Sequence, residues 1–174
     1  MAHTSIRLAA AAVLLISGAS SALAAGPTDP QIAHIAYSAG NIDIAAGKQA
    51  LARSRNKAVR SFAAEMVRDH SAVNVKALAL VKKLHVTPET NPTSAALSKQ
   101  ASATLRRLSH LHGRSFDRAY VANEVAYHKT VNGALADTLI PSASNGELKS
   151  LLETGLTLFR EHQAHAEHLA ASLK

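Results

Sequence analysis

Apolar residues recur every three to four positions along most of the chain, which predicts a series of long amphipathic helices. No segment shows the strict apolar and polar alternation of a half-buried strand, so the expected fold class is all-α. Changes in this periodicity mark where each helix begins and ends. The expected helices span residues 29–52, 56–84, 94–112, 115–140 and 144–173.

Residues that cap or break helices separate these segments. Asn56 can cap the second helix, because its side chain can accept a hydrogen bond from a free backbone N–H. Pro88 and Pro92 favour a loop before the third helix. Gly113 is expected to end the third helix and Pro141 to stop the fourth, since glycine favours helix C-termini and proline cannot donate within a helix.

The third helix is about 19 residues or roughly 28 Å long, similar to the others, so it can carry the chain from one bundle end to the other. The sequence therefore predicts an up-down helical bundle with a helical crossover between the second and third core helices. In that arrangement His70 and His128 lie roughly 20 Å from a common end of the bundle, and His162 and Asp43 lie roughly 15 Å from it. The four side chains are thus expected at nearly one level.

Three histidines interrupt the apolar rows of different helices: His70, His128 and His162. Imidazole is costly to bury without a polar partner. Carboxylates lie nearby, because Asp69 adjoins His70 and Glu124 is one helical turn before His128. Such a cluster is typical of a polar site inside a bundle.

The cluster is a candidate metal site with nitrogen and oxygen ligands, suited to iron, manganese or zinc. Met66, one turn before His70, adds copper to these ions. The Glu-x-x-His motif of carboxylate-bridged di-iron bundles is absent, so di-iron oxidase chemistry is not expected. The candidate ligands are Asp43, Asp69, His70, Glu124, His128 and His162.

The same residues have two other interpretations. They can form a metal-free network in which Asp69, Glu124 and a tyrosine (Tyr120 or Tyr127) satisfy the histidines. Tyr120 is expected to be a core aromatic whose hydroxyl bonds to Glu124. The histidines can also act as a pH sensor if they titrate near neutrality. The remaining motif-like histidines are expected at the surface: His85, His110, His112, His165 and His168.

Composition limits the classes of function. The 174-residue chain has 47% hydrophobic and 3% aromatic residues, as expected of one helical domain, and it has no cysteine, which excludes thiolate chemistry. Its formal net charge is +7, and a basic turn, Arg53, Arg55, Lys57 and Arg60, could contact anionic envelope components. Nucleic acid is not an expected partner, because the charges are dispersed and few aromatics could stack on bases. Motifs of nucleophilic hydrolases are also absent, so that chemistry is not expected. Whether the protein has another enzymatic activity is left open by the sequence.

The N-terminus has the pattern of a signal peptide. Arg7 precedes an uncharged run, residues 8–16, and the small-x-small sequence Ala22-Leu23-Ala24 follows. Residues 1–24 are therefore predicted to be a cleaved signal and residues 25–174 the bundle domain, although an uncleaved anchor is the alternative. No other apolar run approaches the length of a membrane span, so we expect no transmembrane domain after cleavage.

Four short motifs resemble those of the bacterial domain of unknown function 4142 family. They are Met-Val-Arg-Asp-His at 66–70, Phe-Asp-Arg-Ala-Tyr at 116–120, Glu-Val-Ala-Tyr-His at 124–128 and Leu-Phe-Arg-Glu-His at 158–162. The resemblance covers essentially the whole mature chain. It implies export to the periplasm or outer envelope and a ferritin-like bundle with a crossover. The motif histidines correspond to His70, His128 and His162, and the acidic position of the first helix corresponds to Asp43.

These observations lead to one hypothesis and one alternative. The hypothesis is an exported ferritin-like bundle that binds a transition metal for storage, sequestration or redox and stress protection in the cell envelope. The alternative is a non-enzymatic structural or interaction protein of the envelope, whose interior histidines and carboxylates form a metal-free network.

Overall fold

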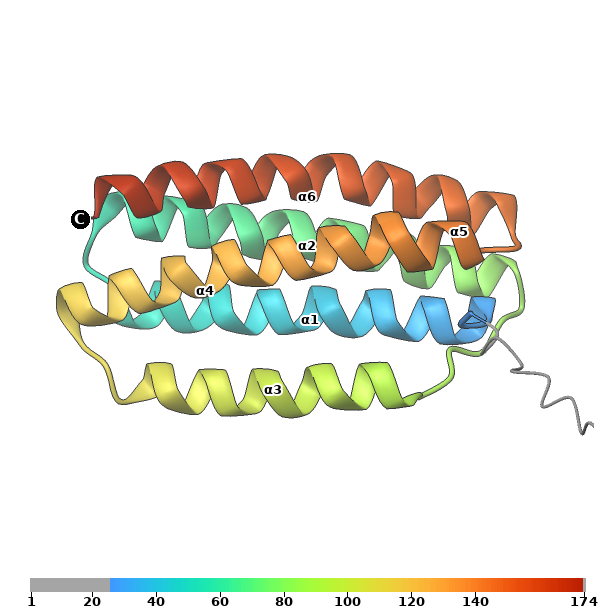
Figure 1. Cartoon of the computed structure of the whole chain (residues 1–174), viewed down its shortest axis with the longest axis horizontal. Coiled ribbons are helices and arrows are strands. Elements are labelled where there is room, and N and C mark those ends of the chain that lie inside the picture. Colours follow the sequence, from blue (N-terminus) through green and yellow to red (C-terminus); the bar gives the residue numbers. More distant parts are fainter. Residues whose placement is uncertain (1–25, 174) are drawn as a thin grey trace, which may run out of the picture.

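The computed structural model describes residues 26–173, and in this part of the chain all regular structure is helical (Figure 1). A π-helix, labelled η1, continues the fourth long helix and leads into the short α5. The elements are α1 (Asp29–Arg53), α2 (Lys57–Lys83), α3 (Pro92–Ser109), α4 (Gly113–Ala134), η1 (Leu135–Leu139), α5 (Ile140–Ser142) and α6 (Gly146–Ser172).

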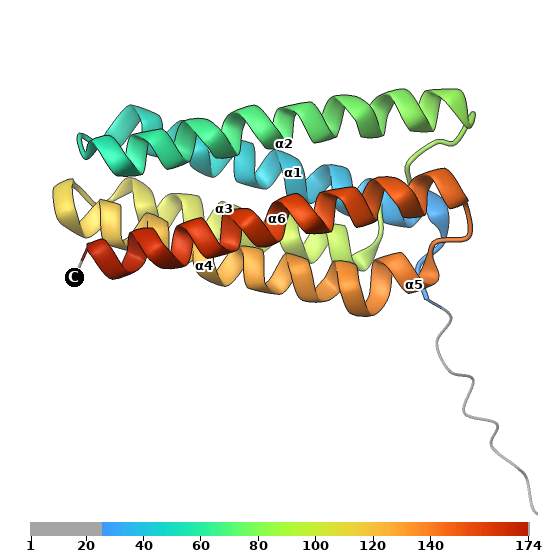
Figure 2. The ribbon, with the colours of Figure 1, turned by 90° about the horizontal axis from the view of Figure 1, so that it is seen from above.

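Four long helices, α1, α2, α4 and α6, form the bundle (Figures 1 and 2). When α3 is included, each of the five long helices runs antiparallel to the one before it in the chain. The closest pairs are α1 with α2 and α4 with α6, and α2 also packs against α6. The remaining long helix, α3, lies outside the bundle against α1 and returns the chain to the other end. The predicted all-α bundle with a helical crossover is confirmed.

Two apolar clusters form the core, one on each side of the level at which the three histidines lie. The first is nearer the C-terminal end of α1 and includes Phe62, Met66, Phe116, Tyr120 and Val121, all fully buried. The second is at the α5 end, and its buried members are Ile32, Ile35, Leu135, Leu139, Leu148, Leu152, Leu156 and Phe159. Burial of these faces holds the helices together, because removing apolar area from water is the main favourable term in folding.

The helix starts follow the capping pattern of the sequence. Asn56 caps α2 as predicted, since its Oδ1 accepts hydrogen bonds from the N–H groups of Ala58 at 2.9 Å and Val59 at 3.3 Å. Asn91 caps α3, which begins at Pro92, two residues before the predicted start. Proline suits this first position because its missing N–H would have no partner in the helix.

Two predicted helix ends are wrong. Gly113 does not end α3, which stops at Ser109; it begins α4 with a φ of 52°, a left-handed conformation that glycine reaches at little cost and that lets the chain reverse. Pro141 does not stop the fourth helix. The chain widens into η1, in which Ile140 N–H donates to the Leu135 carbonyl, and Pro141 then lies in α5 before helical geometry ends at Ala143.

No helix among residues 26–173 has the length and apolar character needed to cross a membrane. The predicted signal peptide, residues 1–24, lies outside the described residues.

Candidate metal centre

The three histidines that interrupt apolar rows converge in the interior from α2, α4 and α6. His70, His128 and His162 are 3%, 1% and 1% exposed. Their ring centroids are 5.4 to 5.7 Å apart. One ring nitrogen of each lies within 4.8 Å of the others, which is close enough for all three to approach a single ion.

Asp43 brings a carboxylate from α1 to the same place, and it is 1% exposed. Its Oδ2 lies 2.9 Å from His70 Nε2 and 3.3 Å from His128 Nε2. Neither contact is aligned as a hydrogen bond, so these three atoms are buried without a hydrogen-bond partner among the described residues. Such unsatisfied polar atoms are costly in a protein interior.

The hydrogen bond of His128 defines which of its nitrogens carries the proton. Nδ1 lies 3.0 Å from the backbone carbonyl of Glu124, which can only accept, so Nδ1–H donates to it. Burial lowers the pKa of His128 to about 4, against the opposing effect of the Asp43 charge, and the ring is neutral at pH 7. Its Nε2 therefore carries a lone pair and lies 3.3 Å from Asp43 Oδ2. Two acceptors lie beside each other, an arrangement that a nearby cation would stabilise.

His162 is held from the outer side by Asp69. Its Nε2 donates to Asp69 Oδ2 over 3.1 Å, which leaves Nδ1 as a buried lone pair with no partner among the described residues. Arg68 fixes the same carboxylate by two hydrogen bonds of 2.6 and 2.9 Å. The hydrogen bonds to Arg68 are the main cause that lowers the pKa of Asp69. Burial is the main cause that lowers the pKa of His162. A carboxylate that orients the far nitrogen of an imidazole is common behind metal-ligating histidines.

The two buried carboxyl groups differ in ionisation. Burial, together with the neighbouring charge of Asp43, raises the pKa of Glu124 well above its usual range. Burial alone would also raise the pKa of Asp43, but its contact with His70 and the positive charge that His70 and His128 carry when protonated bring it below its usual value. The cluster thus contains one anionic carboxylate and one carboxyl that favours its proton. Carboxylate oxygens of Asp43 and Glu124 and a nitrogen of His128 lie within 4.8 Å of one another.

The structure therefore separates the six candidate ligands into two groups. Asp43, His70, His128, His162 and Glu124 meet in the interior. Asp69 lies outside them and reaches the cluster through His162.

Two neighbours of the cluster were not predicted from the sequence. Phe159 stacks on His70 with ring centroids 4.5 Å apart and planes 14° from parallel. Arg68 orients Asp69. Spacing offered a signal for both, since Phe159 is three residues before His162 and Arg68 adjoins Asp69. Tyr127, expected as an alternative partner of the histidines, instead donates its hydroxyl to the Ala39 carbonyl over 2.8 Å.

The expected bond between Tyr120 and Glu124 is wrong. Tyr120 is a fully buried core aromatic, as predicted, but its hydroxyl has no hydrogen-bond partner among the described residues. The ring instead packs with Phe62 and Phe116 in the first apolar cluster, with centroids 6.3 and 6.2 Å away. Packing of the ring has determined where the hydroxyl points.

The five histidines that were predicted to lie at the surface do so. His85, His110, His112, His165 and His168 are all exposed. His165 pairs with Glu65 of α2 through a 2.9 Å contact outside the cluster.

Two of the four cationic side chains in the basic turn have a structural role. Arg53 donates to the carbonyls of Ser109 and Leu111, at 2.7 Å each, and so joins the end of α1 to the end of α3. Arg60 donates to the carbonyls of Leu51 and Ser54. The other two cations of the turn, Arg55 and Lys57, are exposed.

The fold and the cluster define an all-α helical bundle with buried histidines and carboxylates at mid-height in its core. Residues 16–169 match a family described as a domain of unknown function (DUF4142). The chain belongs to this family, in agreement with the motifs in the sequence. The search of curated proteins and the search of solved structures each found no match to the chain.

Proposed function

We propose that the protein binds a transition-metal ion in the interior of its bundle, through Asp43, His70 and His128, with His162 and Glu124 completing the site. The observation that carries the proposal is the contact between His128 Nε2 and Asp43 Oδ2 at 3.3 Å. Both atoms are acceptors, both are buried, and both lie beside His70 Nε2. A bound cation would satisfy all three atoms at once.

The donor set fits such an ion. Neutral imidazole and carboxylate are ligands that iron, manganese, zinc and copper(II) accept. No cysteine is present in the chain, and the Met66 side chain belongs to the first apolar cluster, so nitrogen and oxygen are the expected donors. Because Glu124 favours its proton in the metal-free protein, its coordination would release that proton.

The role that suits a buried site of this kind is storage or sequestration of the metal, or redox and stress protection, in the cell envelope. The location rests on the N-terminal pattern of the sequence and on the family resemblance. No reaction is part of the proposal.

Elemental analysis of gently purified protein tests the proposal, together with uptake of iron, manganese, zinc and copper by chelator-treated protein. We expect stoichiometric metal in the wild type and none in a His70→Ala, His128→Ala double variant. His165→Ala is the matched control, because it removes an exposed histidine from α6 and should keep the metal. Circular dichroism would establish that each variant is folded.

The contrary result is protein without metal that takes up none of the four ions and shows no change in melting temperature with any of them. That outcome would favour the alternative, an envelope structural or interaction protein with a metal-free network. The hydrogen bonds of His162 to Asp69 and of His128 to the Glu124 carbonyl would then be the interactions that keep the imidazoles in the core.

A further inference from the structure

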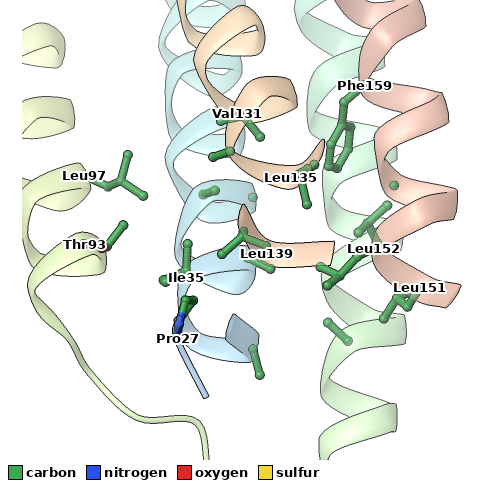
Figure 3. A pocket seen from close by; sticks show the side chains of 18 of the residues that line it. Pro27, Ile35, Thr93, Leu97, Val131, Leu135, Leu139, Leu151, Leu152 and Phe159 are labelled. Atoms are coloured by element: carbon green, nitrogen blue, oxygen red, sulfur yellow. The ribbon is translucent and has the colours of Figure 1, made fainter. Parts of the chain in front are cut away.

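A cavity of about 720 Å³ occupies the half of the bundle between the histidines and the α5 end (Figure 3). Its size is within the range of small-molecule sites, roughly 300–1,000 Å³. The lining is mostly aliphatic and aromatic and, among the described residues, includes no Asp, Glu, Lys or Arg. Side chains that define its walls include Ile35, Leu97, Val131, Leu135, Leu152 and Phe159.

The cavity is elongated along the bundle. On α2 its lining extends from His70 to Val81, and on α6 from Leu148 to Phe159, which is about 16 Å at 1.5 Å per residue. The hydrocarbon core of a bilayer is about 30 Å thick, so one acyl chain of a lipid covers roughly 15 Å. The cavity therefore matches the length of one acyl chain.

One side of the cavity opens to solvent. The exposed residues Thr93, Thr130 and Thr138 belong to its lining and place the opening between α3 and the second half of the α4–η1 segment. These two segments diverge toward the α5 end (Figure 1). The rim thus offers hydroxyl groups, whereas the inner end is closed by Phe159 beside His70 and His128.

We propose that this cavity binds a single-chain lipid, with a fatty acid as the simplest member, whose acyl chain lies along the bundle axis. A largely apolar cavity holds water poorly and favours the binding of apolar molecules. The carboxyl group remains at the threonine rim, because the lining contains no Lys or Arg to receive it and Asp43 lies beyond the inner end. This proposal does not depend on a bound metal.

Displacement of a fluorescent fatty-acid analogue by unlabelled fatty acids of 8 to 16 carbons tests the proposal with the purified protein. We expect saturable binding that tightens about fourfold for each added CH₂ and levels off once the chain exceeds the cavity. Ala77→Phe, which fills part of the cavity from α2, should weaken binding at least tenfold. Ala79→Phe is the matched control, because residue 79 is exposed on the same helix and does not line the cavity.

Non-saturable binding, or an affinity that does not change with chain length, would overturn the proposal. Equal binding by wild type and a folded Ala77→Phe variant would overturn it as well. If Ala77→Phe does not fold, Ala36→Phe makes the same test from α1, since Ala36 also lines the cavity. Fatty-acid binding is measured with and without metal. The result can therefore be interpreted even if the protein binds no metal.

Discussion

Asp69 and His162 are joined across the interface of α2 and α6, with Asp69 Oδ2 3.1 Å from His162 Nε2. The contact makes Nε2 the protonated nitrogen and leaves Nδ1 for the interior. Asp69 is therefore a positioning residue in the proposed site, and Arg68 holds it in place by two hydrogen bonds.

Asp69→Ala should weaken metal binding by about 10- to 100-fold, the range observed when an outer carboxylate behind a ligating histidine is removed. The fold should persist, because Asp69 lies at the edge of the cluster. Titration of chelator-treated protein with each metal measures the effect. Glu153→Ala is the control, since Glu153 is an exposed carboxylate on α6 that belongs to none of the groups of candidate ligands. An equal loss in both variants would contradict a specific role for Asp69.

Glu124→Gln should separate metal binding from folding. The pKa of Glu124 is raised well above its usual value by burial and by Asp43, so the folded state retains a proton that the unfolded state loses above about pH 4.5. In the wild type this difference lowers the free energy of unfolding as pH rises. The neutral glutamine has no such dependence.

Metal-free Glu124→Gln should therefore resist denaturant at least as well as the wild type, by a margin that grows with pH. Its metal affinity should fall by 10-fold or more. Removing an outer partner of a metal ligand costs about 10- to 100-fold, and the loss of a ligand should cost at least the lower value. Glu161→Gln, at an exposed position, should change neither quantity. Loss of stability at pH 7 without loss of metal would contradict both expectations.

His128 should make the metal-free protein less stable in acid. Its pKa is lowered by burial from 6.5 to about 4, so between these values the unfolded state binds more protons than the folded state. The free energy of unfolding then falls as pH decreases from about 6.5 to 4, by about 3 kcal/mol in total from this residue. Denaturant unfolding of wild type and His128→Asn across this range measures the difference. Parallel pH profiles for the two proteins would rule out the lowered pKa.

Two glycines should respond oppositely to alanine. A Cβ at Gly47 would lie 2.9 Å from Val67 Cγ2 and 3.0 Å from the Ala63 carbonyl oxygen, so Gly47→Ala forces α1 and α2 apart. We expect it to destabilise the protein by about 1–3 kcal/mol, the typical effect of overpacking. A Cβ at Gly133 would meet nothing within 4 Å, and Gly133→Ala should stabilise α4 by up to about 1 kcal/mol. Thermal melts of the two variants would contradict this packing if they shifted in the same direction.

The periodicity of apolar residues was sufficient to predict the five long helices and the crossover, because each helix must bury one face. The level of Asp43 and the three histidines was also predictable, since a fixed rise per residue converts sequence position into height. Helix ends were less predictable. Gly113 and Pro141 are permissive at a helix start as well as at a helix end, and local sequence did not distinguish the two.

The partners of the cluster depended on more than height. Asp69 adjoins His70 in the sequence but contacts His162, because neighbouring residues on a helix point about 100° apart. His70 instead meets Asp43, which is on another helix. Tyr120 and Glu124 share a helix face, yet ring packing directs the tyrosine hydroxyl elsewhere.

The sequence by itself determined the class of fold, the family and the presence of polar residues in apolar rows, because these follow from local periodicity and motif. Only the tertiary structure decided that His128 Nε2 lies beside Asp43 Oδ2, that Asp69 orients His162 from the outer side, and that an apolar cavity lies next to them. These relationships depend on the rotation of each helix about its axis and on the spacing between helices. Both are set by packing of the whole core, to which residues far apart in the sequence contribute.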